Sequence, residues 1–188
     1  MGNPYSSRQD QSQPARFVHM FVLGVDPGLT RCGYAVVEPR PGGKGRARAL
    51  GVIRTPPSTE TPYRLWEIQR ELRSLIEQYR PTVVAIEKVF FQKNTISATG
   101  VAQVVGLVLV EAVASGAAAV QYTPTEVKAV VAGDGRADKG QVQAMVQMLL
   151  GLATVPRPAD AADAAALALC HLAYDPTLRS VRTEGTKL

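Results

Sequence analysis

Residues 20–38 read MFVLGVDPGLTRCGYAVVE, and this stretch decides the fold. An apolar run, Met20–Val25, ends at the turn signal Asp26-Pro27-Gly28, and a second apolar run, Gly33–Glu38, follows after a short connection. Two strand patterns joined this closely predict an antiparallel hairpin. Asp26 directly follows the first strand, so we expect it at the rim of the sheet, where α/β proteins place their ligands.

The rest of the chain predicts further strands and helices around this hairpin. Strands are predicted at Ala49–Arg54, Val83–Ile86 and Ala118–Tyr122, and the wholly apolar second of these is typical of a strand covered on both faces. Helical spacing and breaks predict helices over Tyr63–Tyr79, from Asn94 to about Ser115, from Thr123 onward, over 139–150 and over Ala159–Tyr174. This order indicates an α/β fold with a mixed sheet.

Two of the helix starts carry capping signals. Thr123 is followed by a proline at the first helical position and by Glu126 at the third, and Asp138 with Gln141 repeats the arrangement. In each pair the side chains satisfy backbone N–H groups that the first turn leaves without partners. We therefore expect both helices to begin at these residues.

The composition fits one folded domain. The chain has 188 residues, of which 46% are hydrophobic and 20% charged, so it can bury a core. Its two cysteines, Cys32 and Cys170, are too few for a disulfide scaffold and favour a reducing cytoplasm. A disulfide miniprotein, a collagen-like fibre and a coiled coil are excluded.

The two ends lack hydrophobic periodicity. We interpret residues 1–19 as a flexible N-terminal extension, residues 20–175 as the folded domain and residues 176–188 as a flexible basic tail. The N-terminal segment has no apolar signal core. The longest apolar stretch, Val101–Val120, contains Glu111, and a carboxylate at the centre of a membrane span costs roughly 2.5–3.5 kcal/mol. We interpret it as a buried helix and expect no membrane association.

Three more acids join Asp26 at positions that favour chemistry. Glu87 also directly follows a buried-type strand, and Asp160 and Asp163 are three residues apart in the first turn of an alanine-rich helix, on one face. Each has a structural alternative, because first-turn acids complement the helix dipole and Asp before Pro-Gly is common in turns. Glu87 is the hardest to explain structurally, since an acid that ends a buried strand needs a partner.

Convergence of the four acids at one edge of the sheet predicts a metal site. Two carboxylates about 5 Å apart repel by roughly 3 kcal/mol at an effective dielectric constant near 20, so four together would be poorly tolerated without cations. Oxygen ligands suit Mg²⁺ or Mn²⁺, and two such ions hydrolyse a phosphodiester without a side-chain nucleophile. The net charge of +5 becomes +9 when the four acids are set aside (21 basic against 12 acidic residues), which favours a polyanionic substrate.

Basic and aromatic residues near these acids are candidate nucleic-acid contacts. Lys88 and Lys93 flank Phe90 and Phe91, an arrangement in which the rings stack on bases while the lysines hold phosphates. The alternative is that the phenylalanines belong to the core. Further candidates, for which a solvated loop is the alternative, are Lys128, Arg136 and Lys139.

These residues carry a resemblance to a known family. The segments GVDPGLTRCGYAVVE, VVAIEKVFFQKN, YTPTEVKAVVAGDGRADKGQVQAMV and PADAADAAALALCH, in this order and spacing, resemble the RuvC family of Holliday-junction resolvases. The resemblance covers Met20 to Tyr174 and implies an RNase H-like fold with a mixed five-stranded sheet flanked by helices. It implies a homodimer that resolves four-way junctions in recombination and repair by paired, symmetric nicks, and that works with the RuvA–RuvB branch-migration complex.

The resemblance also assigns roles to single residues. Asp26, Glu87, Asp160 and Asp163 match the metal-binding acids, Phe90 matches the aromatic residue that contacts unstacked bases, and Lys128 and Lys139 match basic residues of junction binding and catalysis. The long helix from Asn94 contributes to the dimer interface. The family has His at the position of Asp160 in some members, whereas His171 of this chain is interpreted as a helix residue and not as a ligand.

Three other functions are considered. Asp26-Pro27-Gly28-Leu29-Thr30 resembles the phosphate loop of actin-like ATPases and sugar kinases, but residues 20–175 are too few for the two domains which that fold requires. A related nuclease acting on RNA or on other branched DNA is the main alternative. A junction-binding protein without catalysis is a third, which the four acids argue against, because they would repel phosphates.

Overall fold

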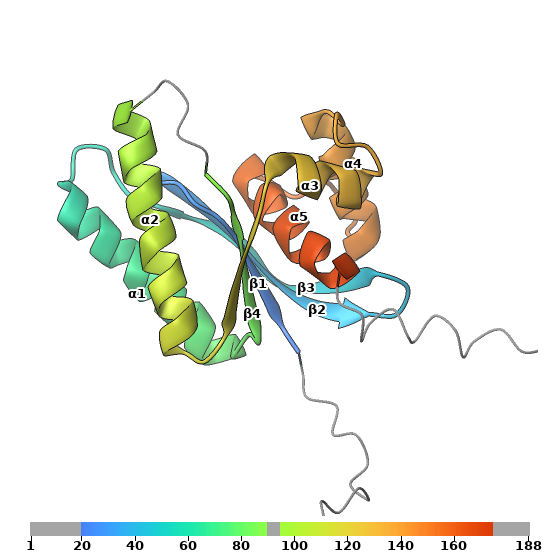
Figure 1. Cartoon of the computed structure of the whole chain (residues 1–188), viewed down its shortest axis with the longest axis horizontal. Coiled ribbons are helices and arrows are strands. Elements are labelled where there is room, and N and C mark those ends of the chain that lie inside the picture. The colour runs from blue at the N-terminus through green and yellow to red at the C-terminus, as the bar shows by residue number, and fades with distance from the viewer. Residues whose placement is uncertain (1–19, 90–94, 175–188) are drawn as a thin grey trace, which may run out of the picture.

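The computed structural model describes residues 20–89 and 95–174. Within these ranges the chain forms five strands and five helices (Figure 1). In chain order they are β1 (Val22–Asp26), β2 (Arg31–Arg40), β3 (Lys44–Arg54), α1 (Thr61–Tyr79), β4 (Val83–Glu87), α2 (Thr95–Ala114), β5 (Ala118–Tyr122), α3 (Pro124–Ala132), α4 (Lys139–Leu150) and α5 (Ala159–Tyr174). Residues 1–19 and 176–188, for which tails are predicted, lie outside these ranges, as does Asn94, the predicted start of the second helix.

The strands form one mixed sheet in the order β3-β2-β1-β4-β5. β1 and β2 are the predicted antiparallel hairpin, with Asp26 opposite Gly33, and β3 continues it antiparallel to β2. β4 and β5 lie parallel to β1 and to each other. The prediction of an α/β fold with a mixed sheet is therefore confirmed.

β3 begins at Lys44, five residues before the predicted start at Ala49. Its first part alternates arginines with Gly45 and Ala47, small residues of low strand propensity that hide the pattern in the sequence. Pairing with β2 from Lys44 opposite Arg40 imposes the strand. The register shifts between Val36 and Val37, so an irregularity interrupts the ladder in its middle.

Helices cover both faces of the sheet (Figure 1). α1 and α2 cover one face, where Leu23 and Ile86 join a core of buried apolar side chains. α3, α4 and α5 cover the other, with α5 lying directly against β1 and β2. The alanine-rich face of α5, from Ala161 to Leu172, is almost wholly buried there. The sheet therefore sits between two cores.

Two glycines let α5 approach the sheet closely. A Cβ atom on Gly24 of β1 would lie 2.0 Å from the backbone oxygen of Ala164, and one on Gly33 of β2 would lie 2.1 Å from that of Asp160. No side chain fits into these contacts. Because both positions lack a side chain, α5 can pack close to the sheet, with its first turn against the ends of β1 and β2.

Both predicted helix caps are present. Thr123 accepts from the Glu126 N–H while the Glu126 side chain accepts from the Thr123 N–H, and Asp138 and Gln141 are paired in the same way. Each helix therefore starts where the sequence indicates.

The apolar stretch Val101–Val120 divides into most of α2, a turn and the first part of β5. α2 buries one face and exposes another, so the expectation of a buried helix holds for one side only. No helix within the described ranges is long and apolar enough to cross a membrane.

Candidate active site

Two of the predicted acids end neighbouring parallel strands. β1 ends at Asp26 and β4 ends at Glu87, and the residues just before them, Val25 and Ile86, are register partners. Parallel neighbours deliver their carboxyl ends to the same edge of a sheet. Asp26 and Glu87 therefore lie side by side, both half-buried.

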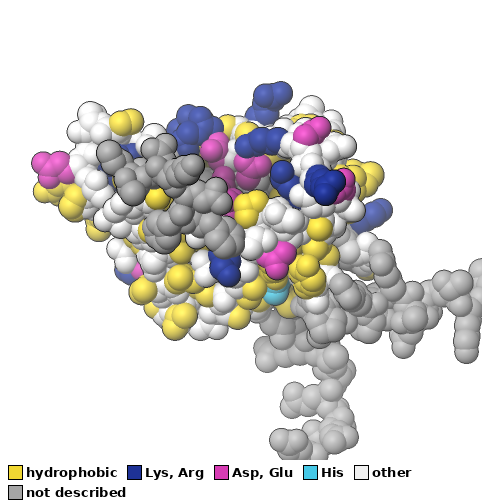
Figure 2. Space-filling view, turned by 45° about the horizontal axis from the view of Figure 1, so that its top comes forward, with side chains coloured by type: hydrophobic (Ala, Val, Ile, Leu, Met, Phe, Trp, Pro, Cys, Tyr) yellow, Lys and Arg dark blue, Asp and Glu magenta, His cyan; other side chains and the backbone are white. Residues whose placement is uncertain are grey.

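The other two acids come to this edge on the first turn of α5. Gly33, which is opposite Asp26 on β2, touches the backbone of Asp160, so the start of α5 lies over the end of the hairpin. Asp163 is one turn further along α5. Figure 2, which brings this edge forward, shows acidic side chains in the middle of a surface bordered by lysines and arginines.

The electrostatics show that the four carboxylates sense one another. Burial, followed by the charges of Glu87, Asp163 and Asp160, raises the pKa of Asp26 to about 7, and Lys139 opposes this only in part. Burial and the charge of Asp163 also raise the pKa of Glu87. Like charges at short range disfavour the ionised form, and an added cation favours it. The edge of the sheet where the four acids lie therefore carries more negative charge than its nearby cations balance.

Two basic side chains hold two of these acids. The Lys139 ammonium donates to Asp163 Oδ2 at 2.7 Å, and the Arg31 Nε donates to Asp160 Oδ2 at 3.0 Å. Burial alone would raise the pKa of Asp160, but the hydrogen bond and charge of Arg31, with the charge of Lys139, lower it overall. Among the described residues, no group of three Asp, Glu, His or Cys side chains is arranged to hold a metal ion. The acids are thus gathered at one edge without forming a finished coordination sphere.

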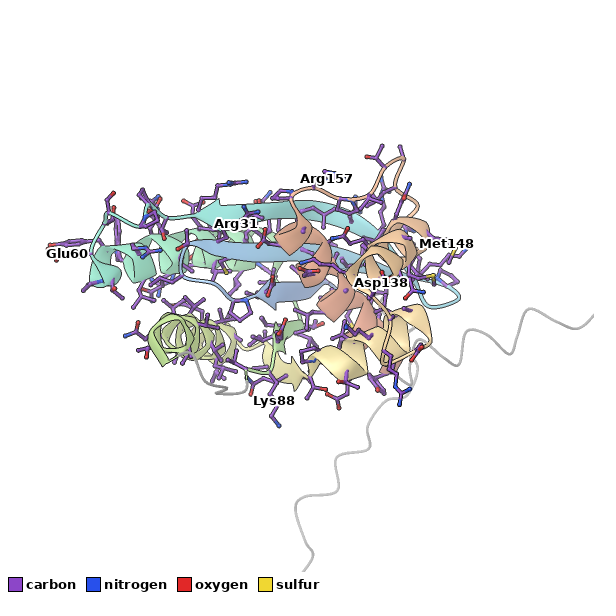
Figure 3. All side chains as sticks on the ribbon, turned by 90° about the horizontal axis from the view of Figure 1, so that it is seen from above. Arg31, Glu60, Lys88, Asp138, Met148 and Arg157 are labelled. Carbon is purple, nitrogen blue, oxygen red and sulfur yellow. The ribbon has the colours of Figure 1, made fainter. Side chains whose placement is uncertain are left out.

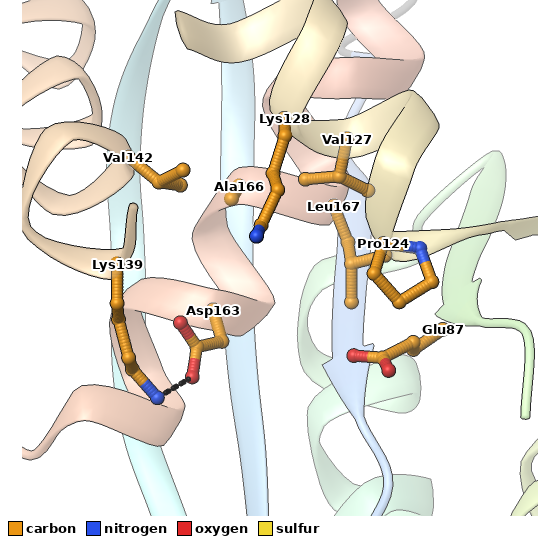
Figure 4. Close-up of a pocket in the computed structure, with 9 residues that line it drawn as sticks. All are labelled: Glu87, Pro124, Val127, Lys128, Lys139, Val142, Asp163, Ala166 and Leu167. Atoms are coloured by element: carbon orange, nitrogen blue, oxygen red, sulfur yellow. Dashed lines mark hydrogen bonds and ion pairs between the residues drawn. The ribbon is translucent and has the colours of Figure 1, made fainter. Parts of the chain in front are cut away.

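A pocket of about 260 Å³ opens beside the acids (Figure 4). Glu87 and Asp163 line one part of it, and Lys128 extends into it from α3. The remaining wall is mostly apolar and comes from α3, α4 and α5, through Pro124, Val127, Val142, Ala166 and Leu167. The pocket therefore places two acids and the predicted basic residues Lys128 and Lys139 around one opening.

The other predicted contacts are placed less tightly. Lys88 is exposed just beyond Glu87 and, in Figure 3, its side chain points away from the body of the protein. Arg136 is exposed on the turn before α4, where its backbone N–H donates to Asp134. Neither lines the pocket. Phe90, Phe91 and Lys93 lie outside the described residues.

His171 lies away from the acids. It pairs through Nδ1 with the Tyr122 hydroxyl at 2.8 Å, in line with its interpretation as a helix residue.

Arg31 lies at the acid edge, and the sequence analysis did not predict it as a site residue. The hairpin register could have indicated this residue, because Gly33 is opposite Asp26 and position 31 is two residues before Gly33 on the same strand.

Comparisons with known proteins agree with this architecture. A family model described as "Crossover junction endodeoxyribonuclease RuvC" matches residues 22–171. Relatives of that name are 50% identical over 163 residues in Parafrankia sp. (strain EAN1pec), covering 87% of this chain and 92% of the relative, and 52% identical over 170 residues in Rhodococcus opacus (strain B4), covering 88% of each.

A solved structure extends the likeness to three dimensions. "T. thermophilus RuvC in complex with Holliday junction substrate" matches with a TM-score of 0.80 at 36% identity, over 87% of this chain and 98% of that chain. The implied RNase H-like fold is thereby confirmed. The chain belongs to the RuvC family of crossover junction endodeoxyribonucleases.

Proposed function

We propose that this chain cuts four-way DNA junctions by metal-dependent hydrolysis, with Asp26, Glu87, Asp160 and Asp163 as the metal ligands. As a family member it is a nuclease that resolves Holliday junctions. The observation that carries the assignment of the ligands is the convergence of the four acids at one edge of the sheet, where burial and the other three acids raise the pKa of Asp26 to about 7. A fold that keeps such a group in place gains most when a cation binds there.

The donor set fits a hard divalent cation. All four candidate ligands are carboxylates, which suit Mg²⁺ or Mn²⁺, and we infer two ions in each site. When bound, such ions supply a water activated for attack and stabilise the leaving oxygen of a phosphodiester. Lys139 and Arg31 hold Asp163 and Asp160 in the absence of metal, so these ion pairs must rearrange for both acids to serve as ligands.

Basic residues around the pocket are proposed to orient the DNA. Lys128 and Lys139 line the opening beside Glu87 and Asp163, a position that suits direct contact with the phosphate to be cut. Lys88 and Arg136 are exposed further out and suit contacts to flanking phosphates. Phe90, Phe91 and Lys93 keep their proposed contacts with the bases and phosphates of the crossover.

A homodimer is proposed because resolution requires two paired cuts. α2 carries an exposed stripe that supports this, with Val110 65% and Val113 70% exposed, and Gly106 with open space beside it. These residues recur at helical spacing on the face opposite the buried residues Val104 and Val108. Such a stripe suits close packing against a second copy of the helix.

Two further proposals follow from family membership and composition. The chain is proposed to act on junctions handled by the RuvA–RuvB complex. A cytoplasmic location is supported by Cys32 and Cys170, which are both buried as free thiols, as expected in a reducing compartment.

Incubation of a mobile synthetic junction with the protein and Mg²⁺ or Mn²⁺ tests the function. We expect symmetric nicks in two strands of like polarity that ligase reseals, and no cutting in EDTA. Linear duplex and structured RNA of equal length serve as competitors. Equal cutting of these competitors, or asymmetric cuts in the junction, would contradict the proposal.

A further inference from the structure

Two arginines face each other where β2 and β3 reach the acid edge. Arg31 and Arg54 are register partners at the end of the antiparallel ladder, so their side chains lie on the same face of the sheet. The next pair, Cys32 and Ile53, is buried on the face covered by α1 and α2. Because strand side chains alternate, the two arginines project onto the opposite face, where α5 begins.

Like charges directly opposite each other weaken a sheet, so this pair needs a counter-charge. Arg31 has one in Asp160, to which both its Nε and a terminal nitrogen donate (Figure 3 shows Arg31 beside the start of α5). Arg54 is exposed and makes no ion pair with any described residue. Only one of the two guanidinium groups therefore has a carboxylate partner among the described residues, and the positive charge of the other is not compensated.

The uncompensated positive charge of this arginine pair lies beside the four acids that are proposed to bind the metal ions. A guanidinium group binds phosphate oxygens through paired N–H donors, and two groups on neighbouring strands can grip one phosphate from both sides. This position is on the β3 side of the acids, whereas Lys128 and Lys139 lie on the side of α3 and α4. A DNA strand that crosses the edge would thus meet cations on both sides.

The same Asp160 oxygen accepts both hydrogen bonds from Arg31. A divalent cation that takes Asp160 as a ligand competes with Arg31 for this carboxylate. Arg31 is half-exposed, with 43% of its side-chain surface accessible, so it is free to turn outward when released. Occupation of the acids and availability of Arg31 are therefore linked.

We propose that Arg31 and Arg54 form a phosphate clamp for the DNA strand beside the acid edge, and that Asp160 holds Arg31 until a divalent cation binds. The second half of this proposal rests on the proposed role of Asp160 as a metal ligand. The clamp itself needs only the two arginines and a DNA backbone.

Junction binding measured against salt concentration tests the clamp. Fluorescence anisotropy with a labelled four-way junction is run in EDTA and in Ca²⁺, which takes the same oxygen ligands, and a gel confirms that the DNA stays intact. Each lost phosphate contact lowers the slope of log affinity against log salt by about 0.9. Arg54→Gln is expected to lose this amount in both conditions, and Arg31→Gln to lose it mainly in Ca²⁺.

Arg48→Gln is the matched control. Arg48 is on the same strand and also pairs with a carboxylate, Glu38 at 2.8 Å, but it lies towards the other end of β3. If Arg31→Gln and Arg54→Gln have the slope of Arg48→Gln, the clamp is wrong and the Arg31–Asp160 pair only fastens α5 to the sheet.

Calorimetric titration of the DNA-free protein with Mn²⁺ tests the competition. Removal of Arg31 is expected to tighten Mn²⁺ binding about two- to fivefold, the range that an exposed ion pair supports. Unchanged Mn²⁺ affinity in Arg31→Gln would overturn the link to the metal. Failure of the clamp and failure of the proposed function are distinguishable, because the salt slope is measured on binding and the role of Asp26 on cleavage.

Discussion

Two regions of this protein treat a carboxylate in opposite ways. On the α1–α2 side, Glu111 is only 5% exposed and accepts hydrogen bonds from Arg73 at 2.8 and 3.0 Å and from Gln69 at 2.5 Å. The bond from Arg73 lowers the pKa of Glu111 despite its burial. At the acid edge, burial and three neighbouring acids raise the pKa of Asp26 to about 7.

The difference separates an acid that stabilises the fold from an acid that is a candidate for binding a ligand. Glu111 ties α2 to α1 and has its donors within the chain. Asp26 and Glu87 are held together at a cost, since Lys139 and Arg31 bind the other two acids and leave these two without a direct ion pair in the described structure. A region that the fold leaves electrostatically unfavourable is a candidate for function.

The largest expected effect separates the two regions by cleavage. Asp26→Asn removes a proposed metal ligand and should slow junction cutting by on the order of a thousandfold, equivalent to about 4 kcal/mol in the activation free energy. Rates are measured on the synthetic junction under single-turnover conditions.

Glu111→Gln is the matched control for that loss, because it changes a buried acid of the other region in the same way. Its rate should stay within about threefold of the wild type at equal folded concentration. Full activity of Asp26→Asn would remove the basis for distinguishing the two regions.

The next effect is a pH dependence of stability to which Asp26 contributes strongly, in the same direction as Glu87, whose pKa is also raised. The pKa of Asp26 rises from 3.8 to about 7 on folding, so the folded state keeps a proton that the unfolded state has lost between these values. Stability in EDTA should therefore fall as the pH rises from about 4 to 7, by on the order of 3 kcal/mol from this group. Urea unfolding of wild type and Asp26→Asn across this window measures it.

The variant Asp26→Asn lacks the titrating carboxyl, so its stability should fall less with rising pH. At about pH 8 it should be more stable than the wild type, although it is the less active protein. Parallel pH profiles for the two proteins would show that the carboxyl of Asp26 ionises freely, like that of an exposed acid.

A smaller effect is expected when the partner of Glu111 is removed. Arg73→Ala leaves a buried carboxylate with Gln69 as its remaining donor and should lower the unfolding free energy more than the loss of a fully exposed ion pair does. Arg70→Ala on the same helix is the control, because its ion pair with Glu71 is exposed on both sides and should contribute less than about 1 kcal/mol. If both variants lose the same unfolding free energy, the ion pair of Arg73 with Glu111 stabilises the fold no more than an exposed pair does.

The smallest effect is the stabilisation by metal. Mg²⁺ at about ten times its dissociation constant should raise the unfolding free energy near pH 8 by about 1.4 kcal/mol. Glu111→Gln should retain this gain and Asp26→Asn should lose most of it. A gain of the same size in all three proteins would place the bound ion away from the acid edge.

The acid edge could be predicted from the sequence because its signals are local. Asp26 and Glu87 each end a short apolar strand, and Asp160 and Asp163 have the spacing of one helix face. The helix caps at Thr123 and Asp138 are local for the same reason. A strand end or a first helical turn is defined by its own few residues.

The arginines that pair with these acids could not be predicted in this way. Arg73 is 38 residues from Glu111, and Arg31 is 129 residues from Asp160. Nothing in the local pattern around an arginine shows which distant carboxylate it meets, because that depends on how the helices pack on the sheet. The early start of β3 has a similar cause, since pairing with β2 overrides its weak propensity.

The dependence of α5 on Gly24 and Gly33 also has a consequence for biosynthesis. Asp26 and Glu87 leave the ribosome well before residues 159–174, and domains assemble as their elements emerge. Until α5 docks, half of the acid set is missing and the sheet face that it covers is bare. The nascent chain therefore completes its set of four edge acids and covers its second core in the same late step.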